Sequence, residues 1–176
     1  MTDSSDFNQC AFSGPCVEFG CTSNVLISAC KKHVRKKVIN YIDHDCYERE
    51  IHILKILNSH GYIWCPKLEW HDDVNKVLIM SYCGEMVTQQ NLPPDYKSQI
   101  AIILTDMEKC NIRHNDIKYE EVLILDGKIH LCDFGWASIC NDLGCGIGLW
   151  EGEKPCGVIK DINIIDYLGK LCIVAQ

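Results

Sequence analysis

Two aspartates flank a predicted β-hairpin in the stretch RHNDIKYEEVLILDGKIHLCDFGWAS, residues 113–138. Apolar runs at 122–125 and 128–132 surround an Asp-Gly pair, which is typical of a two-residue hairpin turn. Because a hairpin returns the chain to its start, we expect Asp116 and Asp133 to lie side by side. One such carboxylate can accept a proton, and the other can hold a divalent cation.

The size and charge of the chain limit what it can bind. Its 176 residues suit one domain with a core, and we expect a loose tail over 1–16 followed by a single domain over 17–176. The net charge of −7 opposes sequence-independent binding of nucleic acid. The start MTDSSD lacks the features of a signal peptide, and no apolar stretch reaches the ~20 residues that span a bilayer. We expect a cytoplasmic protein that contacts neither nucleic acid nor membrane.

Cysteine is unusually frequent, with 13 residues, yet no Cys-x-x-Cys pair occurs. An odd count without a signal peptide favours reduced, mostly buried thiols over a disulfide framework. Cys10, Cys16 and Cys21 form the single grouping that we would test for a metal.

The two halves of the chain differ in their apolar patterns, with a boundary near Gly84-Glu85. In the first half the patterns predict strands at 17–19, 25–29, 34–42, 68–71 and 76–82. They also predict a helix at 47–57, with Glu48, Arg49 and Lys55 facing solvent. In the second half they predict helices at 96–109 and 159–174 around the hairpin.

The motifs around the two aspartates resemble those of the protein kinase family. HNDIK at 114–118 is similar to the catalytic loop of that family, and DFG at 133–135 to its metal-binding turn. Upstream, REIHILK at 49–55 resembles the regulatory helix, and VLIMSYCG at 77–84 resembles the fifth strand and hinge. The resemblance covers roughly residues 17–140 and continues more faintly to the end.

This resemblance implies an α+β, bilobal protein kinase-like fold. The small lobe, at about 17–84, would hold a five-stranded antiparallel sheet. The large lobe, at about 85–176, would be mainly helical and truncated, because no Ala-Pro-Glu follows the metal-binding turn. Such short kinase-like chains are also similar to those of large DNA viruses, which would place this one in a host cytoplasm.

The resemblance also implies roles for single residues. Asp116 would be the catalytic base, and Lys118 would contact the transferred phosphate. Asp133 would ligate Mg²⁺, and Glu50 would pair with the lysine that binds the ATP phosphates. In the hinge, Met80 would be the gatekeeper residue. The backbone of Ser81, Tyr82 and Cys83 would bind adenine.

Three positions depart from the family pattern. Lys36, 14 residues before Glu50, is favoured as the phosphate-binding lysine, but a second register puts Asn40 there. Glu121 stands where the family has a metal-binding asparagine, although a carboxylate can also hold Mg²⁺. Gly20 is the single glycine kept from the glycine-rich loop that covers ATP.

Together these features predict an atypical, weak kinase-like enzyme that transfers phosphate from MgATP to a serine or threonine hydroxyl. ATP and Mg²⁺ would be its cofactors, with an unidentified protein as substrate or regulatory partner. A pseudokinase that binds nucleotide or a partner without catalysis is the alternative. A small-molecule kinase of the aminoglycoside- or choline-kinase type is a third hypothesis, which the hinge and regulatory-helix motifs disfavour.

Overall fold

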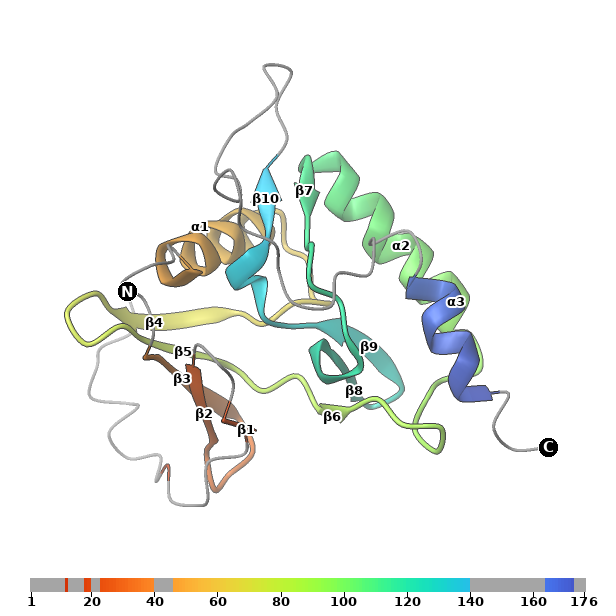
Figure 1. Ribbon diagram of the computed structural model, residues 1–176, viewed down its shortest axis with the longest axis horizontal. Coiled ribbons are helices and arrows are strands. Elements are labelled where there is room, and N and C mark those ends of the chain that lie inside the picture. Colours follow the sequence, from red (N-terminus) through yellow and green to blue (C-terminus); the bar gives the residue numbers. More distant parts are fainter. Residues whose placement is uncertain (1–11, 13–17, 20–22, 40–45, 140–163, 173–176) are drawn as a thin grey trace.

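The computed structural model describes residues 12, 18–19, 23–39, 46–139 and 164–172. Figure 1 shows two groups of elements. Strands β1 to β5 and helix α1 lie toward one end of the molecule, helices α2 and α3 with β6, β8 and β9 lie toward the other, and β7 and β10 stand between them. No helix in these residues is long and apolar enough to cross a membrane.

Four strands of five or six residues make up the main antiparallel sheet. In spatial order they are β2 (Ser23–Ile27), β3 (His33–Val38), β5 (Val77–Ser81) and β4 (Leu68–Asp72). The two-residue β1 (Glu18–Phe19) only extends the β2 edge. The five-stranded antiparallel sheet predicted for the small lobe is therefore corrected to four full strands, because the strand predicted at 17–19 forms only a two-residue edge. The α+β class with antiparallel sheets is confirmed.

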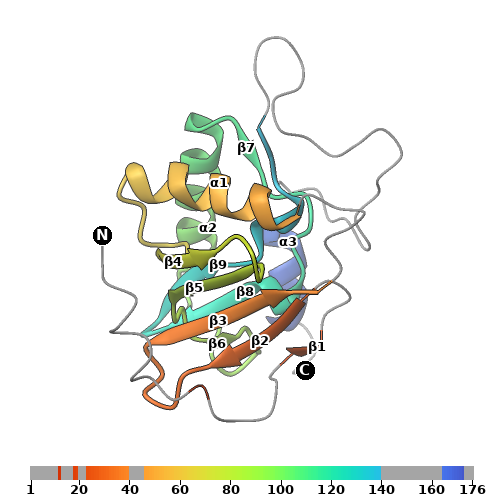
Figure 2. The ribbon, with the colours of Figure 1, turned by 90° about the vertical axis from the view of Figure 1, so that its left-hand side faces the viewer.

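Helix α1 (Cys46–Ser59) lies beside β4 in both views (Figure 1, Figure 2). Its buried residues Tyr47, Ile51 and Leu54 recur at helical spacing and join the core. The helix predicted at 47–57 is confirmed, with one residue added before it and two after.

The predicted hairpin is also confirmed, as β8 (Val122–Leu125) and β9 (Lys128–Leu131). Asp126 and Gly127 in its turn have φ of 50° and 72°, as a type I′ turn requires. The short β6 (Glu85–Met86) pairs with β8 and completes a three-stranded sheet.

The helices of the second half pack beside this hairpin. Helix α2 (Tyr96–Lys109) matches its predicted bounds and buries Ile100, Ile103 and Met107. Helix α3 (Ile164–Gly169) contacts α2 and continues into a 3₁₀ turn, Lys170–Cys172. The rest of the helix predicted at 159–174 lies outside the described residues.

Gly84, where the two groups of elements join, can accept no side chain. Its φ is +106°, and a Cβ there would lie 2.0 Å from the Ile124 carbonyl oxygen. We expect Gly84→Ala to lower the free energy of unfolding by about 3 kcal/mol or more, because strain and overlap add. Gly127→Ala is the matched control, since its φ is +72° with no atom within 4 Å of the new Cβ.

Urea denaturation of both variants measures the difference. The control should lose only the cost of a left-handed residue, about 1–2 kcal/mol. Equal losses for the two variants would contradict the close approach of Gly84 to β8.

Candidate active site

Lys36 on β3 binds two carboxylates that come from different parts of the chain. Its Nζ lies 2.7 Å from Oε2 of Glu50 on α1 and 2.7 Å from Oδ1 of Asp133, which follows β9. Lys36 and Glu50 are buried, while the Asp133 side chain remains 30% exposed. The main sheet, α1 and the turn after the hairpin therefore meet at one ammonium group.

The charges of this cluster depend on one another. Burial lowers the pKa of Lys36, but Asp133 and Glu50 together raise it well above its usual value. Burial raises the pKa of Asp133, but Lys36 outweighs burial and holds that pKa below its usual range. For Glu50, burial outweighs Lys36 and raises the pKa. Lys36 thus stays protonated, and Asp133 stays ionised at neutral pH.

A second cluster surrounds Asp116, in the loop before a 3₁₀ helix, Tyr119–Glu121. The Nζ of Lys118 lies 2.9 Å from Oδ2 of Asp116 and 3.5 Å from Oε1 of Glu121. The other Asp116 oxygen, Oδ1, is buried and accepts no hydrogen bond within the described part of the chain. Since buried acceptors are normally satisfied, this oxygen is available to a ligand.

The two aspartates of the sequence motif lie close enough to influence each other. Burial raises the pKa of Asp116 above its usual value, Lys118 lowers it, and the charge of Asp133 raises it. With Glu50 and Glu121, the two clusters hold four carboxylates against two lysines. A site with this excess of negative charge favours a divalent cation, for which carboxylates are suitable ligands.

Phe134 connects the two clusters through a shared core. Its side chain is fully buried, with its ring centroid 4.8 Å from that of His114 and 6.5 Å from that of Trp64. The Nε2–H of His114 donates to the Cys132 carbonyl oxygen at 2.9 Å. The Asp116 loop and the Asp133 turn therefore pack against each other through Phe134 and His114, which limits their relative movement.

The predicted hinge begins at Ser81, the last residue of β5. Met80 is buried within that strand. The amide N–H groups of Ser81 and Tyr82 donate, at 2.9 and 2.8 Å, to backbone carbonyl oxygens before β4 and β3. Among the described residues, the Cys83 amide donates to no acceptor. Of the three predicted hinge residues, Cys83 thus has the N–H that is available to a ligand.

Arg49 was expected to face solvent, and this prediction is wrong. Its side chain is 1% exposed, and Nη1 donates to the Gly135 carbonyl oxygen at 2.9 Å. Asn115 is a second residue to which the sequence assigned no role, although its side chain contacts the segment after the Asp133 turn. An asparagine beside a motif aspartate is the one sequence signal that could have suggested it.

Several predicted positions lie outside the described residues. They are Gly20, Asn40 and the cysteine grouping Cys10, Cys16 and Cys21. The structure describes free thiols at Cys30, Cys46, Cys65, Cys83, Cys110 and Cys132. Within its described ranges it contains no group of three or more His, Cys, Asp or Glu side chains arranged to hold a metal.

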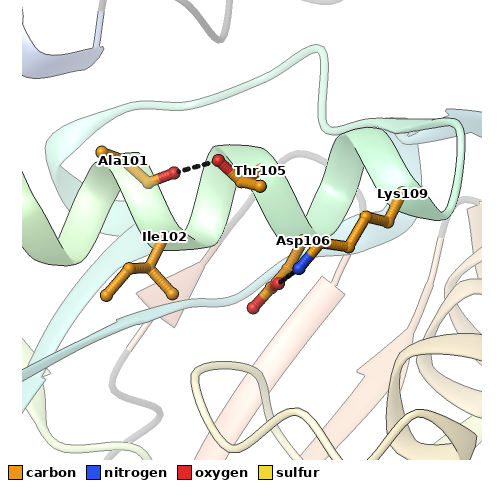
Figure 3. A pocket seen from close by; sticks show the side chains of 5 residues that line it. All are labelled: Ala101, Ile102, Thr105, Asp106 and Lys109. Atoms are coloured by element: carbon orange, nitrogen blue, oxygen red, sulfur yellow. Dashed lines mark hydrogen bonds and ion pairs between the residues drawn. The ribbon is translucent and has the colours of Figure 1, made fainter.

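A shallow hollow on α2 is separate from these clusters. Figure 3 shows its lining, Ala101, Ile102, Thr105, Asp106 and Lys109, along one side of the helix. Lys109 binds Asp106 at 2.8 Å, and the Thr105 hydroxyl donates to the Ala101 carbonyl oxygen. None of the predicted site residues lines this hollow, so it is not part of the candidate active site.

Comparison with known proteins gives one matching family and several relatives. The protein kinase domain family matches residues 16–146. An Aurora kinase of Saccharomyces cerevisiae is 35% identical over 130 residues, which cover 64% of this chain and 34% of that protein. The serine/threonine-protein kinase cds1 of Schizosaccharomyces pombe is 30% identical over 127 residues, which cover 65% of this chain and 26% of that protein.

The match covers only part of each relative. An Aurora kinase of Encephalitozoon cuniculi is 34% identical over 80 residues, or 39% of this chain and 29% of that protein. The chain thus spans about a third or less of the relatives that it matches. The family match covers most of the chain, including both aspartate motifs, and the chain therefore belongs to the protein kinase domain family.

Proposed function

We propose that this chain transfers the γ-phosphate of ATP to a serine or threonine hydroxyl. The observation that carries the proposal is the contact of Lys36 Nζ with both Glu50 and Asp133, at 2.7 Å each. A lysine in this position can bind phosphate oxygens while the aspartate beside it holds their metal. Kinship with serine/threonine kinases supports the choice of hydroxyl.

Adenine would bind at the hinge, with Met80 as gatekeeper and the backbone of Ser81, Tyr82 and Cys83 along its edge. The unpaired Cys83 amide supports this role, since an adenine nitrogen can accept its hydrogen. Gly20 would belong to the loop that covers the ATP phosphates. Lys36 would hold the α- and β-phosphates, with Glu50 fixing its ammonium group.

Mg²⁺ would be held by Asp133 and Glu121, and would neutralise phosphate charge during transfer. Asp116 would accept the proton of the substrate hydroxyl at its unpaired Oδ1. The hydroxyl oxygen would form a bond to the γ-phosphorus while the bond to the bridging oxygen breaks and ADP leaves. Lys118, beside Asp116, would stabilise the negative charge on the transferred group.

The pH dependence of transfer should report on Asp116. A base must be ionised, so activity falls as the pH drops through its pKa, which burial raises above the usual value. Lys118 opposes that rise, so Lys118→Met should move the acid limb of kcat to higher pH. The exposed Lys128, in the hairpin, is the matched control. An acid limb that stays in place in Lys118→Met would contradict this assignment.

Transfer of labelled γ-phosphate from MgATP to serine- and threonine-containing peptides, or to the chain itself, tests the proposal. The expected result is incorporation that requires both ATP and Mg²⁺. Incorporation on tyrosine alone, or none at any substrate concentration, would contradict it.

A pseudokinase is the second candidate, and Glu121 favours it. This buried carboxylate stands at the position of a family asparagine, 3.5 Å from Lys118 and 3.7 Å from the Cys132 thiol. Its charge would weaken nucleotide binding unless a metal offsets it. Nucleotide binding without transfer to any substrate would favour this candidate.

The proposal includes a bilobal arrangement, with a small lobe at about 17–84 and a large lobe from about 85. The Lys36 cluster would lie where the lobes face each other. A protein substrate or regulatory partner and a cytoplasmic location complete the proposal, and a viral origin stays a prediction.

A further inference from the structure

Asn115 connects the catalytic loop to the segment that follows the metal-binding turn. It stands between His114 and Asp116 and has a left-handed backbone, with φ of +69°. Its Nδ2 donates to the Trp136 carbonyl oxygen at 3.0 Å and to the Ser138 hydroxyl oxygen at 2.9 Å. One side chain thus spans two points of a segment more than 20 positions away.

The same two segments form only a minimal strand pair. β7 (Ile112–Arg113) and β10 (Ser138–Ile139) pair over two residues each. A ladder this short is marginal by itself, because its few hydrogen bonds must offset the entropy of both segments. The two Asn115 hydrogen bonds extend the pairing toward Asp116.

The turn between these contacts is held in a conformation that side chains disfavour. Asp133 has φ of +58°, and its carboxylate accepts a hydrogen bond from the Gly135 amide at 3.3 Å. Such residues persist where their surroundings fix them. His114 binds the Cys132 carbonyl before the turn, and Asn115 binds the Trp136 carbonyl after it.

We propose that Asn115 is a positioning residue that fixes the Asp133 turn against the Asp116 loop. Two consecutive loop residues hold the turn on both sides, and the next residue carries the unpaired carboxylate oxygen. The distance between the Asp116 and Asp133 carboxylates is then set by the loop residues 114–116 and the turn that they hold. The kinetic part of this inference rests on the proposed function, but the structural part does not.

Asparagine meets both requirements of the position. It tolerates positive φ better than other residues with side chains, and its amide supplies two N–H donors. Glycine would keep the backbone but lose both hydrogen bonds. Aspartate would keep the size and could still accept from the Ser138 hydroxyl, but it could not donate to the Trp136 carbonyl.

Asn115→Gly therefore isolates the side chain, with Asn115→Asp as a second variant in case the first folds poorly. Asn111→Gly is the matched control, because Asn111 also has a positive φ, +54°, and is exposed. Amide hydrogen exchange over residues 136–139 should be about tenfold faster in both Asn115 variants and unchanged in the control. Unchanged exchange in the Asn115 variants would overturn the inference.

The kinetic readout separates positioning from general loosening. In Asn115→Gly, kcat should fall by about tenfold to a hundredfold while KM for ATP rises by a smaller factor, because the hinge and the Lys36–Glu50 ion pair remain in place. Faster exchange with unchanged kcat would overturn the positioning role. If the wild type transfers no phosphate, the proposed function fails, and the exchange result still decides whether Asn115 holds the turn.

Discussion

Lys36→Met is expected to abolish MgATP binding and to lower the free energy of unfolding by about 3–5 kcal/mol near neutral pH. Methionine keeps much of the length of the side chain but removes the ammonium group. Glu50 and Asp133 would then face each other in a buried site with no cation between them. Guanidinium denaturation and nucleotide titration of the variant measure the two losses.

The loss of stability should depend on pH in a defined direction. Without Lys36, the pKa values of both carboxyl groups rise above those of the unfolded chain, so the folded variant binds more protons. Its stability is then highest in acid and falls as the pH rises through these raised pKa values. In the wild type, the contribution of Asp133 should have the opposite pH dependence, because its pKa is lower in the folded protein than in the unfolded chain. Asp133 stabilises the folded state at pH values above its unfolded pKa, and this stabilisation is lost as the pH falls.

Lys37→Met provides the matched control, since Lys37 is the next residue of β3 and is exposed. It should change stability by less than about 0.5 kcal/mol. In the double variant Lys36→Met/Glu50→Gln, part of the lost stability should return, because one uncompensated charge is gone. If Lys36→Ala leaves phosphotransfer intact while Asn40→Lys increases it, the choice of Lys36 is wrong.

Asp116→Asn is expected to reduce kcat by about a hundredfold to ten-thousandfold while nucleotide binding remains. The amide has the shape of the carboxylate but cannot take the proton of a hydroxyl. Lys118 would lose its closest partner, at 2.9 Å, and keep Glu121 at 3.5 Å. Single-turnover transfer and ATP affinity, measured on the same preparation, separate the two effects.

Asp126→Asn is the matched control for this change. Asp126 is exposed in the hairpin turn with φ of +50°, where asparagine is equally suited. It should leave both transfer and binding unchanged. A wild-type kcat in Asp116→Asn would show that another group accepts the proton.

The hairpin and the pairing of the motifs were predictable because their signals are local. Asp126-Gly127 fixes the turn, and the apolar runs on either side fix the register. Helix α2 was predicted with its correct bounds, since its apolar residues recur at helical spacing between Pro94 and the Cys110-Asn111 end.

The choice between Lys36 and Asn40 could not be made from spacing. In β3 the side chains of Lys36 and Val38 are buried and that of Lys37 is exposed. Positions 36 and 40 are four residues apart, so alternation along a strand places both side chains on the same face and does not separate them. In the structure Lys36 forms ion pairs with Glu50 and Asp133, while Asn40 lies outside the described residues.

The burial of Arg49 and the pairing of the short strands depend on contacts between residues that are far apart in the sequence. The partner of Arg49, the Gly135 carbonyl, lies 86 positions later in the chain, so helical periodicity gave the wrong face. β6, β7 and β10 have two residues each, too few to produce a period. Their pairing is set by the loops that bring them together.

Thermal denaturation with ATP, with Mg²⁺ and with both tests the central claim most directly. The Lys36 and Lys118 clusters together have more carboxylates than lysines. The negatively charged ATP should therefore bind poorly by itself and bind well together with Mg²⁺. We expect a rise in the midpoint that requires both, worth about 2.7 kcal/mol at a hundredfold excess over Kd, and no rise in Lys36→Met relative to its own midpoint. A midpoint that stays constant under all three conditions would contradict a MgATP site in this chain.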